Sequence, residues 1–155
     1  MKFPYFRFQS APCPAFPERN FSYRPVIPIH IYSLDLKTRF QHYALLDTGA
    51  DYNLFHADLL DVLGVGDVKS GKRQDMFGIE GKGVQTYFHN VIIGVGKWRY
   101  KAYSGFTDFG MVTSPDHMPY GILGQVGCFE HFEVVFDYKK LEVEIKPKDD
   151  IKNDN

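Results

Sequence analysis

The stretch from Ala44 to Phe55 constrains the fold most, because it brings a carboxylate to a tight turn at the end of an apolar run. Leu45 and Leu46 precede Asp47 without polar alternation, which predicts a strand buried on both faces. Gly49 lets the backbone turn sharply and lets another segment approach it closely. We therefore expect Asp47 at a point where a buried strand meets a cavity.

Length and composition limit the fold class. A chain of 155 residues can form one domain with a substantial core. It contains 14 Gly, 10 Tyr and 14 Phe and has no long helical pattern, which favours many short strands joined by tight turns. The 18 Lys and Arg balance 19 Asp and Glu, so charge gives no reason to expect nucleic acid or an anionic membrane as a partner. We predict an all-β domain with one or two short helices.

Cysteine and histidine usage predicts a protein without disulfides or metals. Two cysteines, Cys13 and Cys128, are too few for a disulfide framework, and the six histidines include no pair at metal-binding helical spacing. The N-terminus has no apolar core of signal-peptide length, and no run approaches a transmembrane span. We expect a cytoplasmic protein with reduced thiols and with no metal or other cofactor.

The chain divides into three segments. Residues 1–25 are rich in proline and aromatic residues; the prolines exclude a helix or central strand, and the aromatics argue against disorder. We expect an extended arm packed on its own domain or on a partner subunit, and a sticky, partly ordered leader is the alternative. Residues 26–146 form the predicted domain. Residues 147–155 form a polar tail that we expect to be disordered.

Within the domain, apolar periodicity predicts mostly strands. Pro28 suggests an edge position for the first strand, and the glycine-rich stretch 78–83 predicts the tip of a long hairpin. A short helix is expected over His56–Leu63, ended by Gly64, and Gln125–His131 also has a helical pattern. The expected strands are Val26–Tyr32, Arg39–Leu46, Val68–Phe77, Val84–Val95, Trp98–Phe106, Phe132–Phe136 and Leu141–Ile145.

Three motifs follow one another in a fixed order. They are Asp47-Thr48-Gly49-Ala50, then Gly78-Ile79-Glu80-Gly81, then Ile122-Leu123-Gly124. By itself Asp-Thr-Gly also fits an ordinary β-turn, but the joint occurrence is far more specific. The order resembles the catalytic loop, flap tip and apolar-apolar-glycine segment of the retropepsin-like aspartic proteases, over about residues 26–146. The resemblance implies a single-lobed acid-protease barrel.

The resemblance also implies an aspartic endopeptidase. Such an enzyme needs two neighbouring carboxylates that share a proton, and this chain has one Asp-Thr-Gly. We therefore expect a homodimer in which the second Asp47 comes from an identical subunit across a two-fold axis. By resemblance, the Thr48 hydroxyls bond across between the two loops, and the Gly49 carbonyl binds the substrate backbone. Ala50 and Asp51 are assigned to binding the peptide or protein substrate.

The flap tip carries one departure from the family pattern and the third motif carries another. A glycine-rich tip at residues 78–81 is suited to closing over an extended peptide. Glu80 stands where a small residue is usual, and its carboxylate would bar acidic substrates, favour basic ones or point to solvent. Gln125 stands where retroviral relatives have an arginine that pairs with the residue matching Asp51. This departure favours a cellular or bacterial branch of the family.

Two other interpretations stay open. A protease-like dimer that binds peptide without cutting it would keep the fold and the cleft, and Glu80 and Gln125 are compatible with it. An unrelated β-barrel would use Asp47 only as a turn residue. A dimer that binds peptide without cleavage supports the first alternative, and a strict monomer without a cleft supports the second.

Overall fold

The computed structural model describes residues 1–77, 81, 83–107, 120–148 and 151–153. Strands make up 58% of it and helix 6%, with a single α-helix, which confirms the all-β prediction. The helices are α1 (Asp58–Val62) and the one-turn 3-10 helix η1 (Val68–Ser70). The strands are β1 (Lys2–Pro4), β2 (Phe6–Gln9), β3 (Phe21–Arg24), β4 (Val26–Tyr32), β5 (Arg39–Leu46), β6 (Leu54–His56), β7 (Lys72–Phe77), β8 (Gly83–Val95), β9 (Trp98–Thr107), β10 (Gly121–Leu123), β11 (Phe132–Asp137), β12 (Glu142–Pro147) and β13 (Lys152–Asn153).

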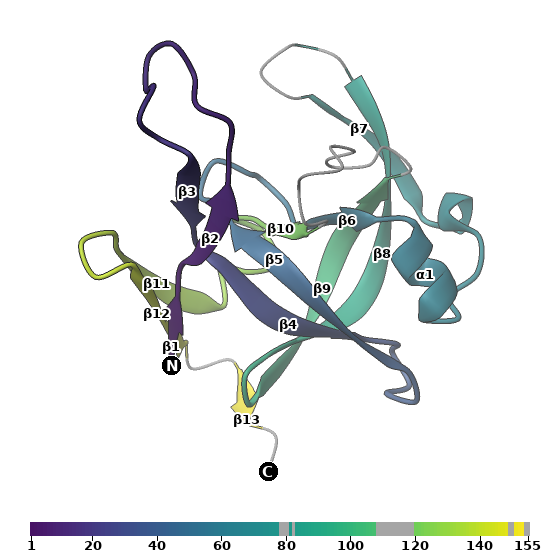
Figure 1. The fold of residues 1–155 in the computed structure, drawn as a ribbon. Coiled ribbons are helices and arrows are strands. Elements are labelled where there is room, and N and C mark those ends of the chain that lie inside the picture. Colours follow the sequence, from purple (N-terminus) through teal and green to yellow (C-terminus); the bar gives the residue numbers. More distant parts are fainter. Residues whose placement is uncertain (78–80, 82, 108–119, 149–150, 154–155) are drawn as a thin grey trace.

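The central sheet closes on itself into a barrel (Figure 1). Its strand order is β13-β9-β6-β10-β5-β4-β8-β7, and an additional antiparallel pairing of β8 with β9 completes the circle. The short strand β10 lies between β5 and β6, parallel to the first and antiparallel to the second. This insertion is what brings the segment after β10 against the end of β5.

The barrel core follows from alternation along its strands. In β4, Ile27, Ile29 and Ile31 are fully buried, and from β5 Ala44 and Leu46 join them. Every second side chain of a strand points to the same face, so these residues fill the barrel from neighbouring strands.

The face of β5 that points away from the barrel core is covered by the N-terminal arm. Leu45 is half-buried there and packs with Phe8 and Tyr120. The Phe8 and Tyr120 rings meet edge to face at 5.7 Å, and the Arg24 guanidinium donates a hydrogen bond to the Tyr120 hydroxyl. The strand was predicted to be buried on both faces, and residues of the arm help to cover its outer face.

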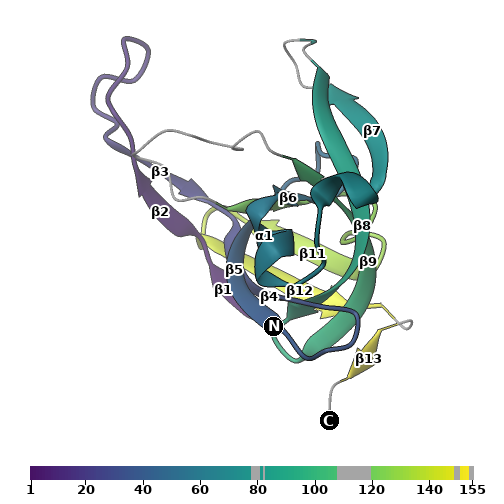
Figure 2. The ribbon, with the colours of Figure 1, turned by 90° about the vertical axis from the view of Figure 1, so that its right-hand side faces the viewer.

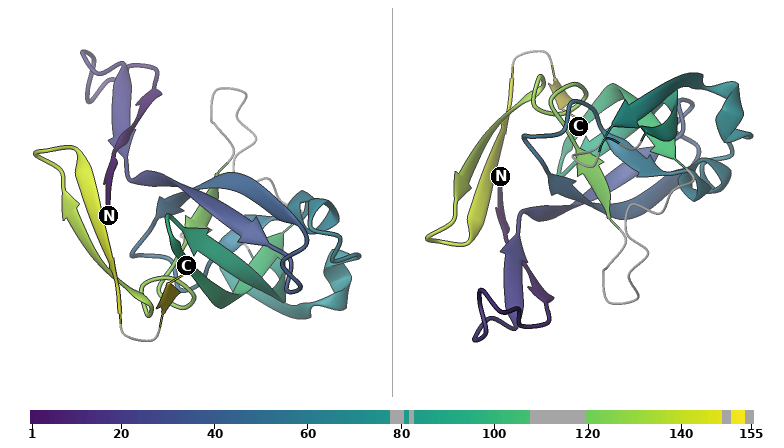
Figure 3. Two further views of the ribbon diagram at one scale, coloured as in Figure 1. Left: turned by 90° about the horizontal axis from the view of Figure 1, so that it is seen from below. Right: turned by 90° about the horizontal axis from the view of Figure 1, so that it is seen from above.

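The arm itself is built of strands. β1 pairs with β12 of the terminal hairpin, which gives a three-stranded sheet, β1-β12-β11, at one side of the barrel (Figure 3). β2 and β3 form a separate hairpin. Figure 2 shows that this hairpin and the β7–β8 hairpin extend toward the same end of the barrel.

Four local expectations differ from the structure. Residues 125–131 form hydrogen-bonded turns and no helix, because Gly127 has φ 95° and the Phe129 and Glu130 amides bond five residues back. Val68–Ser70 is a 3-10 turn rather than the start of a strand. Pro28 suggested an edge strand, but β4 lies between β5 and β8 in the sheet. Pro28 itself is in the part of β4 that pairs with β5 alone, and residues 30–32 pair with both neighbours. The tail contains the short strand β13, paired with β9, where disorder was expected.

Candidate active site

Asp47 stands at the end of β5, where the barrel strand turns into a loop. Its backbone amide donates to the Leu123 carbonyl at 3.0 Å, which continues the parallel pairing of β5 with β10 by one residue. Its carboxylate Oδ1 accepts a hydrogen bond from the Gly49 amide at 2.9 Å, and the Ala50 amide donates to the Asp47 carbonyl at 3.2 Å. The turn therefore fixes both the backbone and the side chain of a half-buried aspartate.

The segment after Asp47 is crossed closely by the segment after β10. We name residues 47–53 and 121–127 together the loop crossing. A Cβ atom at Gly124 would lie 2.5 Å from the Tyr52 carbonyl oxygen and 2.7 Å from that of Ala50, so only glycine fits. The Gln125 amide donates to the Ala50 carbonyl at 2.9 Å. The Val126 amide donates to the Asp51 carbonyl at 2.8 Å.

A buried asparagine that sequence reasoning missed ties the loop crossing together. Asn53 has no exposed surface, and its Oδ1 accepts from the Gly124 amide at 3.0 Å. Its Nδ2 donates to the Gly127 carbonyl at 2.9 Å and approaches the Ser104 hydroxyl at 3.4 Å. A buried amide with all these partners is strongly oriented. The sequence signal that could have identified Asn53 is its position as a polar residue directly before the apolar pair Leu54-Phe55.

The tip of the aspartate loop faces outward. Thr48, Gly49 and Asp51 are exposed, and Ala50 is half-buried. The Gln125 side-chain amide donates to the Thr48 carbonyl at 2.7 Å, so this residue supports the loop backbone. Among the described residues, no cation forms an ion pair with the Asp51 carboxylate within 4.0 Å.

The predicted site residues fall into two groups. Asp47, Thr48, Gly49, Ala50 and Asp51 share one ordered turn at the end of β5. Of the predicted flap tip, Gly81 is exposed with φ 71°, a left-handed conformation suited to glycine. Gly78, Ile79 and Glu80 lie outside the described residues, so the position of the Glu80 carboxylate stays a prediction.

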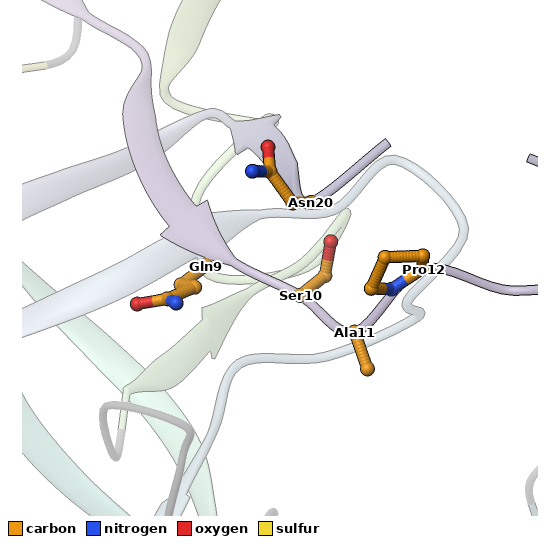
Figure 4. Close-up of a pocket in the computed structure, with 5 residues that line it drawn as sticks. All are labelled: Gln9, Ser10, Ala11, Pro12 and Asn20. Atoms are coloured by element: carbon orange, nitrogen blue, oxygen red, sulfur yellow. The ribbon is translucent and has the colours of Figure 1, made fainter. Parts of the chain in front are cut away.

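Cavities lie next to both projecting hairpins. One, of about 430 Å³, follows the end of β2 and is lined by Gln9, Ser10, Ala11, Pro12 and Asn20. Figure 4 shows the Gln9 and Ser10 side chains pointing to opposite sides of the chain where β2 ends. A neighbouring one of about 370 Å³ is lined by Arg7, Gln9, Asn20 and Phe21. A third, of about 220 Å³, is lined by Tyr52, Lys72, Gln74, Phe88 and Tyr103, and so includes a residue of the loop crossing.

The described part of the chain has neither a cluster of metal-binding side chains nor a membrane-spanning helix. No group of three or more His, Cys, Asp or Glu side chains is placed to hold a metal ion there. In the same residues, no helix is long and apolar enough to cross a membrane.

Comparisons with known proteins gave similarity in structure alone. No protein-family model matches the sequence, and no curated protein sequence matches it. Among solved structures, the fold is similar to a retropepsin-like aspartic protease from Rickettsia conorii, with 14% identity, a TM-score of 0.49, and coverage of 92% of this chain and 91% of that chain. It is also similar to EIAV protease in complex with the inhibitor HBY-793, with 24% identity, a TM-score of 0.45, and coverage of 66% and 82% respectively. Both likenesses are modest and concern the fold.

Proposed function

We propose that the protein is an aspartic endopeptidase that acts as a homodimer, with Asp47 as its catalytic carboxylate. The observation that carries the proposal is the geometry of the loop that holds Asp47. A half-buried carboxylate lies at the end of a barrel strand, fixed through Oδ1 and through its backbone amide, within an outward-facing Asp-Thr-Gly turn. An ordinary surface turn does not need a glycine-tight crossing and a buried asparagine behind it.

The outward direction of the turn supports pairing with a second copy. One chain offers one Asp-Thr-Gly, and two turns facing each other across a two-fold axis bring two Asp47 carboxylates together. Like charges at short separation cannot both ionise easily, so the pair holds one proton between them. Thr48 is exposed at the tip, where its hydroxyl is available to the opposite loop.

With one proton on the pair, the residues can divide the work of hydrolysis. The ionised Asp47 takes a proton from a water molecule as the water oxygen attacks the scissile carbonyl carbon, and the protonated one donates a hydrogen bond to the carbonyl oxygen. When the C–N bond breaks, the leaving nitrogen takes up a proton from the pair. Gly49, Ala50 and Asp51 are assigned to the substrate main chain, and residues 78–81 to closure over it. No cofactor is required.

A second candidate function is a dimer that binds peptides without cutting them. The Gln125 side chain is the observation that favours this second candidate. It donates a hydrogen bond to the Thr48 carbonyl, whereas the arginine found at this position in retroviral relatives would pair with Asp51. A cytoplasmic location stays a prediction from the sequence under either candidate.

A proteome digest followed by mass spectrometry tests the activity without a known substrate. Wild type, Asp47→Asn and Asp61→Asn are incubated with denatured proteome over about pH 3 to 8, the range in which a carboxylate pair titrates. Asp61 is an exposed carboxylate on α1, so Asp61→Asn controls for loss of one negative charge. New peptide ends with wild type and Asp61→Asn, and none with Asp47→Asn, support the proposal. No new ends from any variant of a confirmed dimer would favour the binding module.

A further inference from the structure

The cavity of about 220 Å³ beside the loop crossing combines an aromatic wall with a positive charge. Its lining comes from four elements: Tyr52 from the loop crossing, Lys72 and Gln74 from β7, Phe88 from β8, and Tyr103 from β9. We name it the Lys72 pocket. Tyr52 directly follows Asp51 in the sequence, so the pocket includes the chain neighbour of a predicted substrate-binding residue.

Ring contacts give the pocket a rigid wall. Phe88 is 5% exposed and lies between the two tyrosines. Its ring meets the Tyr52 ring edge-on, with centroids 5.3 Å apart, and the Tyr103 ring at 5.4 Å. Gly105 lies opposite Phe88 in the β8–β9 pairing, and a Cβ there would come within 3.3 Å of the Phe88 ring. The wall is therefore preformed, with its rings at favourable separations.

Strand alternation separates the charges of β7. Lys72 and Gln74 line the pocket, whereas Arg73 and Asp75 alternate with them and pair with each other at 3.2 Å. Lys72 is directly opposite Phe88 in the β7–β8 register. Within the described residues, no carboxylate lies within 4.0 Å of the Lys72 ammonium group. Lys72 and Gln74 are both exposed, so the pocket presents to solvent an ammonium group that has no ion-pair partner among the described residues, beside the donor group of an amide.

We propose that the Lys72 pocket binds an acidic side chain of the peptide substrate, and that Lys72 determines this preference. The inference rests on the proposed peptide-processing function. A glutamate or aspartate places its carboxylate against the Lys72 ammonium group and the Gln74 amide, while its methylene carbons lie along the aromatic wall. A lysine or arginine side chain is repelled by Lys72, and an apolar side chain forms no ion pair with it.

The test uses two readouts, so that the pocket and the peptidase activity are judged separately. Cleavage sites in a denatured proteome are compared for wild type, Lys72→Met and Lys72→Glu. Lys139→Glu, an exposed lysine in the β11–β12 turn, is the matched charge reversal outside the pocket. In parallel, immobilised Asp47→Asn protein, with and without Lys72→Glu, is incubated with a random decapeptide library and the retained peptides are sequenced.

The expected result is an acidic residue enriched about tenfold at one position relative to the cleaved bond. Lys72→Met abolishes this enrichment, Lys72→Glu replaces it with lysine and arginine, and Lys139→Glu leaves it unchanged. The Asp47→Asn protein retains acidic peptides, and Lys72→Glu removes that preference. If acidic peptides are retained but wild type cleaves nothing, the proposed peptidase activity is refuted and the proposed acidic preference of the pocket is supported. The proposed acidic preference of the pocket is refuted if Lys72→Glu changes the amino-acid preferences in neither readout. It is also refuted if neither readout shows acidic enrichment.

Discussion

The loop crossing and the outer part of the β7–β8 hairpin both carry predicted site residues, yet different forces fix them. In the loop crossing, Asn53 is completely buried, and Gly124 lies too close to the backbone of Tyr52 and Ala50 to carry a side chain. In the hairpin, residues 72–75 are exposed and Phe77 is 71% exposed, so the strand pairing with β8 is the main constraint. The first region holds its aspartate through buried contacts as well as backbone hydrogen bonds, and the second is held mainly by its strand pairing.

This difference matches the two tasks of a peptide-cleaving site. A carboxylate pair has to be placed to within a fraction of an ångström, which favours close packing and satisfied buried hydrogen bonds. A surface that receives varied peptides benefits from low local stability and exposed backbone. Substitutions in the loop crossing should therefore reduce stability and activity together, whereas those in the hairpin should change substrate binding alone.

The largest effect is expected for Gly124→Ala. The new Cβ would lie 2.5 Å from the Tyr52 carbonyl oxygen, so the two loops must separate. We expect the free energy of unfolding to fall by about 3 kcal/mol or more, measured by urea denaturation. Gly64→Ala is the control: Gly64 has φ 68° with no atom within 4 Å of a Cβ, so only backbone strain of about 1–2 kcal/mol applies. Equal losses for the two variants would contradict a tight crossing.

Asn53→Ala should follow in size. It leaves the Gly124 amide and the Gly127 carbonyl buried without their partner, which costs about 2 to 3 kcal/mol. Peptidase activity should fall as well, because the loop crossing positions Asp47. Asn90→Ala, at an exposed position of β8, is the comparison and should leave both quantities unchanged within error. Full activity in a destabilised Asn53→Ala protein would show that Asn53 stabilises the fold but is not needed to position Asp47.

Alkaline pH should weaken the fold through a thiol next to the loop crossing. Burial raises the pKa of the Cys128 thiol from 9.0 to about 12. The unfolded thiol loses its proton first, so this contribution is intact below about pH 9 and is lost between pH 9 and 12 at about 1.4 kcal/mol per pH unit. Between pH 9 and 12, the free energy of unfolding should therefore fall less steeply with pH in Cys128→Ala than in wild type. Cys13→Ala, which removes an exposed thiol, should keep the wild-type slope, and identical slopes for all three proteins would refute the assignment.

Gln125→Ala should have a small effect on stability. It removes the 2.7 Å hydrogen bond to the Thr48 carbonyl at an exposed position, which is worth about 1 kcal/mol. Because this bond supports the tip of the aspartate turn, we expect a larger relative loss of activity than of stability. Gln41→Ala, an exposed glutamine on β5, serves as the control. An unchanged rate would show that the turn holds its shape without Gln125.

Phe77→Ala should change stability least. The ring is 71% exposed at the end of β7, so its loss should alter the unfolding free energy by no more than about 0.5 kcal/mol. If the hairpin closes over substrate, KM should rise while the melting temperature stays constant. A marked loss of stability would mean that the hairpin is fixed as firmly as the loop crossing, and the contrast between the two regions would fail.

Local sequence signals predicted the strands around the site well. β4 and β5 begin and end where the apolar pattern placed them, and α1 lies within the predicted His56–Leu63. Ile122 and Leu123 of the third motif pair with Leu45 and Leu46 just before Asp47, a contact that apolar periodicity alone does not predict. Signals of this kind are read from neighbouring residues, and they succeed where neighbours decide the conformation.

Features that depend on distant residues were missed or wrong. The role of Asn53 requires Gly124 and Gly127, which are more than seventy positions away. The helical pattern at 125–131 did not reveal that Gly127 adopts φ 95°. The tail strand β13 depends on the edge of β9, and the Lys72 pocket depends on the register of β7, β8 and β9. The partners of Asn53, of β13 and of the pocket residues lie far away in the chain, so local patterns do not identify them.

The most direct test of the central claim is a subunit-mixing experiment. A fixed amount of wild type is equilibrated with an equal amount of Asp47→Asn, and the rate of peptide cleavage is measured after exchange. If each site needs Asp47 from two chains, random exchange leaves only half of the wild-type chains with a wild-type partner, and the rate falls by about half. Mixing with Asp61→Asn should instead raise the rate. A rate that stays unchanged or rises with Asp47→Asn, in a mixture shown to exchange subunits, would mean that a dimer with one Asp47 is active and would contradict the shared site.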